Sequence, residues 1–314
     1  MYDYNRKKLC ISSKTPLKNE MEKILYCPRC LRGYLQRNES SSTTCSACNT
    51  HFPQNPTTFF YDFRSQISNQ ERGLLVEQEV DFYGNEIFKD FVRTNTRKRC
   101  EEAIKQLKPK NILDIGCGSG LLAERLKGVF SSYIGYEPSD IPNGMSFAFP
   151  LPTNIFLFHD EADKKLPVHD QSLDLVLFMA SYDHIPNPGP VVRDAWSKLE
   201  PGGNLMIVMS NYEFWVKSIF NFLGGKEFFK HDHEHFCVHS PESLTKEILR
   251  FIPDARLKEI DANDLYIPNL PKSISFLYFS YGWLVFLNGF LKFIFNSIFR
   301  FKHRGSTMIL VFTK

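Results

Sequence analysis

The segment Asn111–Gly120, which reads NILDIGCGSG, constrains the fold of this chain more than any other feature. Its first half holds three apolar residues, Ile112, Leu113 and Ile115, and one acid, Asp114. Its second half places glycine at alternate positions: Gly116, Gly118 and Gly120. Glycine permits positive φ angles and lets a ligand approach the backbone, and the helix expected to follow offers free N–H groups at its start. The pattern predicts a strand, a glycine turn and a helix that bind a nucleotide-like ligand.

The spacing of these glycines and the acid before them narrow the class of ligand. A dinucleotide site usually carries the spacing G-x-G-x-x-G, with the pyrophosphate on the turn. Here the spacing is G-x-G-x-G, and Asp114 would place a negative charge close to any phosphate. A cationic ligand without phosphate fits better, and S-adenosylmethionine (SAM) has both a sulfonium and an ammonium group. In this segment the chain resembles the class I SAM-dependent methyltransferases.

Three further runs after the turn read as strands of the same sheet. Residues 132–137 and 154–160 each close on an acid, Glu137 and Asp160 respectively, and residues 172–180 are nearly all apolar, as suits a strand buried on both faces. The carboxylate of Glu137 can accept hydrogen bonds from both hydroxyls of a ribose, each contributing about 1.5–3 kcal/mol. Strands that alternate with helical segments in this order predict an α/β fold.

The resemblance extends over residues 90–262 and the final strand, 305–314. It implies a Rossmann-like, mostly parallel seven-stranded sheet with helices on both faces and an antiparallel hairpin at one edge. It also implies which residues hold the cofactor SAM: Asp114, Gly116, Cys117, Gly118 and Gly120 at its methionine end, Glu137 at the ribose, Asp160 at the adenine, and Ala180 beside them at the end of the fourth strand. Because SAM is an activated donor, the protein needs mainly to align it with an acceptor, and a base is needed only for a protonated acceptor.

Four cysteines near the start of the chain form a second strong pattern. Cys27 and Cys30 make one C-x2-C pair and Cys45 and Cys48 another, with 14 residues between the pairs. Four thiolates at this spacing are typical of a tetrahedral zinc site, and the segment resembles the small zinc ribbons fused to some methyltransferases. A segment this short has too little core to fold alone, so structural Zn²⁺ is expected to stabilise it. An RNA-gripping role, an iron site and a redox dithiol stay open as alternatives.

Positive charge gathers at the two ends of the chain. The net charge of the 314 residues is only +3, yet residues 1–37 and 265–314 each carry a surplus of six positive charges. The middle is therefore acidic, and the ends are the parts expected to meet an anionic partner such as RNA or lipid. Three arginines lie close to the cysteine pairs: Arg29, Arg32 and Arg37.

The cysteine content and the first residues bear on the cellular compartment. The first residues lack an apolar h-region, so no secretory signal is expected. Eight cysteines in a chain of this length do not suggest a disulfide scaffold, which favours the reducing cytoplasm. The cysteines outside the two pairs are expected to be free thiols: Cys10, Cys100, Cys117 and Cys237.

Histidines are the candidate catalytic residues. His231, His233 and His235 stand at alternate positions and would share one face of an extended strand, which suits an acid–base pair or a metal. The same segment can also be a polar turn leading to a helix capped by Ser240. His184, in the turn after the fourth strand, is either a residue of the acceptor pocket or a turn histidine with satisfied hydrogen bonds.

An aromatic stretch precedes the final strand. Residues 273–291 contain no charged residue over 19 positions, a length that can span a bilayer. However, residues 305–314 must return to the sheet, which a single crossing would prevent. Aromatic residues flanked by Lys and Arg suit a membrane surface, so residues 273–304 are expected to contact the inner face of the membrane or to cover a lipid acceptor. A buried helical cap, a dimer interface and a true membrane span are the alternatives.

These features divide the chain into a basic tail (1–24), a zinc ribbon (25–62), a helical N-terminal cover (63–109), the SAM-binding core (110–264), an aromatic insertion (265–304) and the final strand (305–314). We expect a methyltransferase whose acceptor is a small, hydrophobic or lipid-linked molecule. Methylation of rRNA or tRNA, with the ribbon binding RNA, is the first alternative, although no Asn-Pro-Pro-Tyr-like turn follows the fourth strand. A non-enzymatic zinc-ribbon scaffold with a relic SAM site is the second.

Overall fold

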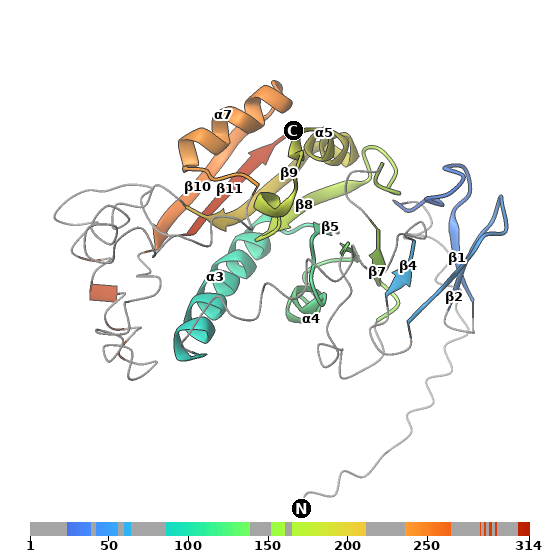
Figure 1. Ribbon diagram of the computed structural model, residues 1–314, viewed down its shortest axis with the longest axis horizontal. Coiled ribbons are helices and arrows are strands. Elements are labelled where there is room, and N and C mark those ends of the chain that lie inside the picture. The colour runs from blue at the N-terminus through green and yellow to red at the C-terminus, as the bar shows by residue number, and fades with distance from the viewer. Residues whose placement is uncertain are drawn as a thin grey trace, which may run out of the picture.

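The computed structural model describes residues 24–38, 42–55, 60–63, 86–138, 152–160, 165–211, 236–264 and 307–314. Five single positions of the aromatic insertion are also described: 283, 286, 289, 290 and 293. The described residues form a large sheet flanked by helices, with a small three-stranded sheet beside it (Figure 1).

The large sheet is mostly parallel. Its strands are β4 (Tyr61–Asp62), β5 (Asn111–Ile115), β6 (Ser132–Tyr136), β7 (Ile155–His159), β8 (Leu173–Met179), β9 (Leu199–Ser210), β10 (Arg256–Asp264) and β11 (Thr307–Thr313). Within the described residues their order is β10-β11-β9-β8-β5-β6-β7-β4. Neighbours from β4 to β9 pair in parallel, whereas β11 pairs antiparallel with β9 and β10. The predicted α/β sheet with an antiparallel edge hairpin is confirmed.

The order of the strands places a crevice at the end of β5. From β5 the chain builds β6 and β7 on one side and β8 and β9 on the other. Where the strand order reverses in this way, the loops at the carboxyl ends of the strands diverge, and open α/β sheets bind their ligands there. The glycine turn follows β5 directly, so it lies at this point.

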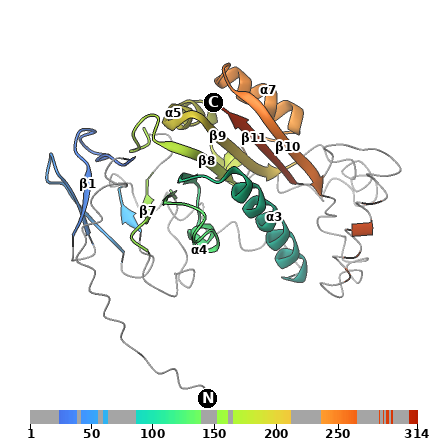
Figure 2. The same cartoon turned by 180° about the vertical axis from the view of Figure 1, so that it is seen from behind.

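Helices cover both faces of the sheet (Figures 1 and 2). One face carries α3 (Glu86–Leu107) and α4 (Leu121–Arg125), and the other carries α5 (Pro188–Lys198) and α7 (Pro241–Phe251). Because successive side chains of a strand point to opposite faces, Leu113 and Ile115 pack with α5 and α7, whereas Ile112 packs with α3 and α4. Both faces are therefore buried, which explains the nearly continuous apolar runs in the sequence.

The last large helix, α7, begins where the sequence predicts. Ser240 is its N-cap: the Ser240 hydroxyl accepts a hydrogen bond from the Ser243 N–H at 3.2 Å, and the Ser243 hydroxyl accepts one from the Ser240 N–H at 2.8 Å. Pro241 occupies the first helical position, where its missing N–H costs nothing. This reciprocal capping box fixes the start of the helix and confirms the predicted cap.

The cysteine-rich segment forms the small antiparallel sheet, in the order β1 (Leu35–Asn38), β2 (Ser42–Cys45) and β3 (His51–Pro53). The segment before it is attached to the core by backbone hydrogen bonds. The Tyr26 N–H donates to the Pro167 carbonyl at 3.0 Å, and the Ile24 carbonyl accepts from the His169 N–H at 2.7 Å. The ribbon is therefore fastened to the loop that leads into β8.

The ribbon also adds a strand to the large sheet. All seven strands expected for the core are present, and β4 joins them in parallel beside β7, with Tyr61 opposite Phe158 and Asp62 opposite His159. The physical reason is aromatic packing, because the Tyr61 ring stacks on Phe156 with their centroids 4.5 Å apart. Ribbon and core thus share one hydrophobic cluster.

The aromatic insertion lies between β10 and β11. Its described positions are all helical. Among the described residues, no helix has both the length and the hydropathy needed to cross a membrane. The final strand β11 returns to the sheet between β9 and β10, as the sequence predicts.

Candidate functional site

The glycine turn packs tightly against the loop after β8. Gly116 has φ 76°, and a Cβ added there would lie 2.3 Å from the Cβ of Ser181, so no other residue fits without a shift. The Ser181 hydroxyl donates a hydrogen bond to the carbonyl of Ile115, which locks the ends of β5 and β8 together. This contact fixes the path of the backbone at the start of the turn.

The middle of the turn is open. Gly118 has φ 54°, and no atom lies within 4 Å of the position that a Cβ would occupy. Gly120, with φ 73°, is the N-cap residue of α4. The backbone at Gly118 therefore leaves space for a bound group, as a glycine turn that cradles a ligand requires.

Glu137 is brought to this turn by β6. It directly follows the strand, and its N–H donates to the Phe158 carbonyl at 3.1 Å, which continues the β6–β7 pairing by one residue. Its Oε2 accepts a hydrogen bond from the N–H of Gly118 at 2.9 Å. Two of the residues that the sequence analysis assigned to the cofactor are thus in direct contact, although they are 19 positions apart.

Asp114 lies beneath the turn and is fully buried. The Tyr133 hydroxyl donates a hydrogen bond to its Oδ2, whereas its Oδ1 has no hydrogen-bond partner within the part of the chain that the structure describes. Burial raises the pKa of Asp114 to about 7; the Tyr133 hydrogen bond opposes this shift, and the negative charge of Glu137 adds to it. Because the carboxyl group is fully buried, it would act on a cationic ligand group through its negative charge and not by direct contact.

Cys117 and Cys100 lie near this carboxyl group. Both thiols are buried, and burial, with the charge of Asp114, raises the pKa of each. Both are free cysteines, as expected from the sequence. They are therefore neutral packing groups and not nucleophiles.

The other two predicted cofactor residues lie at the ends of β7 and β8. Asp160 directly follows β7 and is 3% exposed, and Ala180 directly follows β8, is exposed and has φ 54°. Because parallel strands end at the same edge of a sheet, these residues lie along the edge that holds the glycine turn and Glu137. The open backbone at Gly118, the carboxylate of Glu137 and the negative charge of the buried Asp114 together suit the groups of SAM.

The predicted catalytic histidines are only partly described. His184 is exposed in the short helix η2 (Tyr182–His184), which follows β8. His231, His233 and His235 lie outside the described residues. The segment that follows them contacts η2, next to His184, because the Phe236 N–H donates to the carbonyl of Asp183 at 2.8 Å.

A partly buried polar cluster at η2 was not expected from the sequence. The Tyr182 hydroxyl donates to Oε1 of Glu247 at 2.6 Å, and Nε2 of His239 lies 3.3 Å from the same oxygen. Burial and the charge of Glu247 raise the pKa of Tyr182. Tyr182 lies shortly after β8, so its position near the end of a strand was visible in the sequence. No sequence pattern links it to Glu247 in α7. The cluster fastens α7 to the loop that carries His184.

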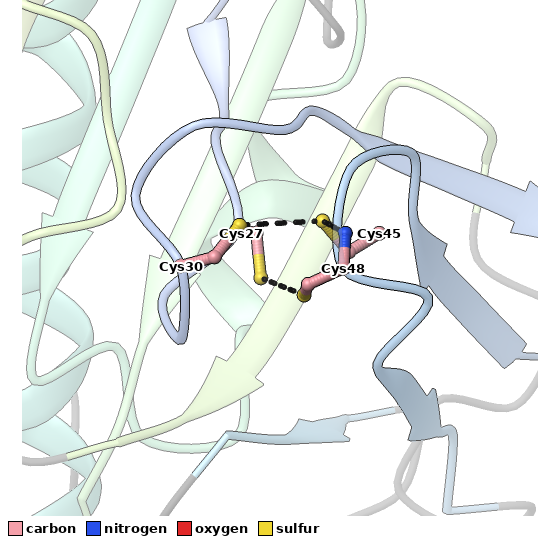
Figure 3. Close-up of side chains that lie close together, drawn as sticks. All are labelled: Cys27, Cys30, Cys45 and Cys48. Carbon is pink, nitrogen blue, oxygen red and sulfur yellow. Dashed lines mark hydrogen bonds between the residues drawn. The ribbon is translucent and has the colours of Figure 1, made fainter.

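The four ribbon cysteines converge (Figure 3). Their sulfur atoms all lie within 4.8 Å of one another, with 3.8 Å between Cys27 and Cys48 and 3.6 Å between Cys30 and Cys45. Zinc–sulfur bonds of ~2.3 Å in a tetrahedron would separate the sulfurs by about 3.8 Å. The arrangement therefore fits a zinc ion. His51 lies nearby on β3 but is not part of the cluster.

Local hydrogen bonds prepare some of these thiols for a metal. Two backbone N–H groups, those of Ala47 and Cys48, point at the sulfur of Cys45 at 3.3 and 3.4 Å. Hydrogen bonds from Thr50 lower the pKa of Cys48 to about 6, whereas burial raises the pKa of Cys27 to about 12. Without a metal, the local hydrogen bonds leave the buried thiol of Cys27 protonated. A bound cation would supply the positive charge that ionises it.

Curated relatives share the methyltransferase part of the chain. The ubiquinone biosynthesis O-methyltransferase of Aliivibrio fischeri is 26% identical over 175 residues, which cover 53% of this chain and 71% of the relative. The protein of the same name from Shewanella pealeana is 27% identical over 137 residues, which cover 40% of this chain and 57% of the relative. The chain therefore spans between about half and three quarters of these relatives' lengths.

Among solved structures, a putative methyltransferase from Bacillus halodurans is similar to this chain, with 16% identity and a TM-score of 0.47. The alignment covers 68% of this chain and 98% of that one. A SAM-dependent methyltransferase from Archaeoglobus fulgidus is similar with 21% identity and a TM-score of 0.43, over 71% of this chain and 94% of that one.

A family model described as a methyltransferase domain matches residues 89–251, slightly more than half of the chain. The match begins in α3 and ends with α7, so it contains the glycine turn, Glu137, Asp160 and the loop after β8. The chain therefore belongs to the methyltransferase domain family and is a class I SAM-dependent methyltransferase.

Proposed function

We propose that this methyltransferase transfers the methyl group of SAM to an oxygen atom of a small, apolar or lipid-linked acceptor. The observation that carries the proposal is an aromatic stripe in the insertion between β10 and β11. Phe286, Phe290 and Phe293 are exposed by 60%, 51% and 67%, and they follow Trp283 at helical spacing. The rings of Trp283 and Phe286, and those of Phe286 and Phe290, are stacked with centroids 5.5 and 6.2 Å apart.

An exposed aromatic stripe of this kind needs an apolar partner. Large apolar side chains that gather on one surface usually mark a binding site and not a solvated face. Residues 265–314 contain six Lys/Arg and no acid, so an anionic lipid surface or a lipid-linked acceptor suits the same region. The relatives named for O-methylation in ubiquinone biosynthesis support oxygen as the acceptor atom.

The residues at the carboxyl edge of the sheet would hold SAM. Glu137 would accept the ribose hydroxyls, Asp160 would lie beside the adenine, and Asp114 and the glycine turn would hold the methionine end. Bound SAM supplies a methyl group on a positively charged sulfur, which is already activated for attack. What these side chains contribute is alignment of that methyl group with the acceptor.

A hydroxyl acceptor also needs a base. With SAM bound, the acceptor oxygen would attack the methyl carbon as the carbon–sulfur bond breaks, and the hydroxyl proton would pass to a side chain. His184, exposed in η2 after β8, is the candidate within the described residues, and His231, His233 and His235 are the others. Zn²⁺ at Cys27, Cys30, Cys45 and Cys48 would stabilise the ribbon and take no part in this step.

Labelling of a fractionated lysate tests the proposal. Full-length protein is incubated with methyl-labelled SAM and with the lipid, RNA and protein fractions of a lysate, and we expect label in the lipid fraction. The triple variant Phe286→Ser, Phe290→Ser, Phe293→Ser should lose most of this labelling but keep its affinity for SAM, because these side chains are exposed and lie outside the glycine turn.

The control variant is Tyr34→Ser, which removes an exposed aromatic side chain from the ribbon and should leave labelling unchanged. Label in the RNA fraction would contradict the proposal and favour the alternative in which the ribbon, with exposed Arg29 and Arg32, binds RNA. Lipid labelling that the triple variant leaves intact would show that the aromatic stripe does not select the acceptor.

A further inference from the structure

The end of the ribbon lies against the edge of the cofactor site. Phe60, the residue before β4, is 1% exposed, and its ring stacks on the imidazole of His159 with centroids 4.4 Å apart and an interplanar angle of 22°. His159 is itself 5% exposed and is the last residue of β7. The Phe63 N–H donates to the His159 carbonyl at 2.9 Å. Phe60 in the ribbon therefore holds the ring of His159, and Phe63, directly after the ribbon, holds its backbone.

The imidazole in turn holds Glu137. Nδ1 of His159 lies 3.0 Å from the backbone carbonyl of Glu137, and since a carbonyl only accepts, Nδ1 carries the proton. The carboxylate of Glu137 accepts from the N–H of Gly118 at 2.9 Å. A continuous path of contacts thus runs from Phe60 through His159 and Glu137 to the glycine turn.

The other end of this path is the metal-binding part of the ribbon. The Asn55 N–H donates to the Phe60 carbonyl at 2.8 Å, and the rings of Phe52 and Phe63 are in edge-to-face contact with centroids 4.5 Å apart. Phe52 lies on β3, which pairs with β2, the strand that ends at Cys45. The position of Phe60 therefore depends on a ribbon whose own folding we expect to require the ion.

We propose that Phe60 and His159 are positioning residues that hold Glu137 for SAM, and that the ribbon is thereby coupled to cofactor affinity. The proposal rests on the assignment of Glu137 to the ribose of SAM. The backbone of Glu137, the residue after β6, is held from β7 on both sides: its N–H donates to the Phe158 carbonyl, and its carbonyl accepts from Nδ1 of His159. A carboxylate that must meet two ribose hydroxyls loses binding when its backbone turns, even if its charge is kept.

If Phe60 only covered the sheet and did not position Glu137, its truncation would leave SAM affinity unchanged. Truncation of a buried phenylalanine lowers the free energy of unfolding wherever it lies, but it lowers SAM affinity only if the side chain positions the site. Phe312 offers a matched control, because it is fully buried on β11, opposite Leu205 at the far side of the sheet from β7. Phe60→Leu and Phe312→Leu should both lower the melting temperature.

The experiment measures SAM affinity of the full-length protein by isothermal titration calorimetry. We expect Phe60→Leu and His159→Leu to weaken binding about fivefold and Phe312→Leu to leave it unchanged. His159→Asn keeps an N–H donor near the position of Nδ1, so it should bind SAM more tightly than His159→Leu. Stripping zinc from the wild type with a chelator should weaken SAM binding to a similar degree.

The decisive test is whether the effects are independent. In a Glu137→Ala background, itself expected to weaken binding about tenfold, Phe60→Leu should cause no further loss, because the group it positions is gone. Additive losses, or unchanged affinity in Phe60→Leu, would overturn the positioning role. Unchanged affinity in Glu137→Ala alone would instead overturn the assignment of Glu137 to the cofactor, on which the proposal rests.

Discussion

The cysteine cluster and the glycine-turn site are both built from short motifs, but they are held together differently. The four sulfurs lie within 4.8 Å of one another on two local turns joined by a three-stranded sheet. The glycine turn, Glu137, Asp160 and Ala180 come instead from the ends of four adjacent parallel strands. The sheet fixes the second site through many backbone hydrogen bonds, whereas little besides a bound ion can hold four thiolates so close.

This difference indicates which site is formed before its ligand arrives. Glu137 already accepts the Gly118 N–H, so the cofactor edge needs no partner to be ordered. In the cluster, burial keeps Cys27 protonated at neutral pH, and a cation is needed to ionise it. We therefore expect metal loss to unfold the ribbon, and SAM loss to leave the sheet intact.

The largest expected effect follows from removal of a cysteine ligand. Cys27→Ser should abolish zinc binding and expose the ribbon to protease, because structural zinc supplies about 10–16 kcal/mol of apparent folding free energy in small zinc domains. The measurements are metal content by mass spectrometry and limited proteolysis, and Cys237→Ser, which removes a free thiol outside the cluster, is the control. Retention of zinc by Cys27→Ser would show that the site does not need all four sulfurs.

The next largest effect lies in the glycine turn. Gly116→Ala should lower the free energy of unfolding by about 3 kcal/mol or more, because the new Cβ would lie 2.3 Å from the Cβ of Ser181 in addition to the strain of φ 76°. Gly128→Ala is the control, since φ there is 84° but no atom lies within 4 Å of the added Cβ. It carries only the backbone strain, about 1–2 kcal/mol.

Urea denaturation of both glycine variants, followed in the presence and absence of SAM, separates the two sources of cost. If both variants lower the free energy of unfolding by the same amount, the backbone at Gly116 can move away from Ser181 at little cost. The turn would then be less rigid than the sheet that carries it. We expect SAM to stabilise Gly128→Ala as it does the wild type and to stabilise Gly116→Ala less.

The features that could be predicted from the sequence are those formed by residues close together in the chain. The glycine turn, the acids at positions 137 and 160 and the two cysteine pairs each depend on residues within a few positions of one another, so their spacing predicts their placement. The fold class followed, because parallel strands with helical crossovers have few possible arrangements. The capping box at Ser240 was predictable for the same reason.

Contacts between distant segments were not predictable in this way. Strand β4 has only two residues, and its pairing with β7 is decided by the aromatic packing of Tyr61 on Phe156. The contact of Tyr182 with Glu247 joins residues 65 positions apart, which no local pattern links. The stacking of Phe60 on His159 belongs to the same class, and it is the contact that joins the two sites compared above.

The smallest expected effect is a pH dependence of SAM binding, which should arise from Asp114 in the glycine-turn site. The pKa of Asp114 is raised to about 7 by burial, so its carboxyl group is largely protonated below this pH in the free protein. A cationic ligand binds the ionised form, so SAM affinity should rise about tenfold between pH 6 and pH 8 and then level off. Calorimetry across this range in one ionic strength is the measurement.

Stability should change in the opposite direction, which makes the assignment to Asp114 testable. A carboxyl group with a pKa near 3.8 when unfolded and about 7 when folded binds its proton more tightly in the folded state. Its contribution to the free energy of unfolding is therefore largest below pH 3.8 and is lost as the pH rises through 7. Asp114→Asn cannot ionise and should flatten both profiles. A variant that keeps the rise in SAM affinity would assign the titration to another group.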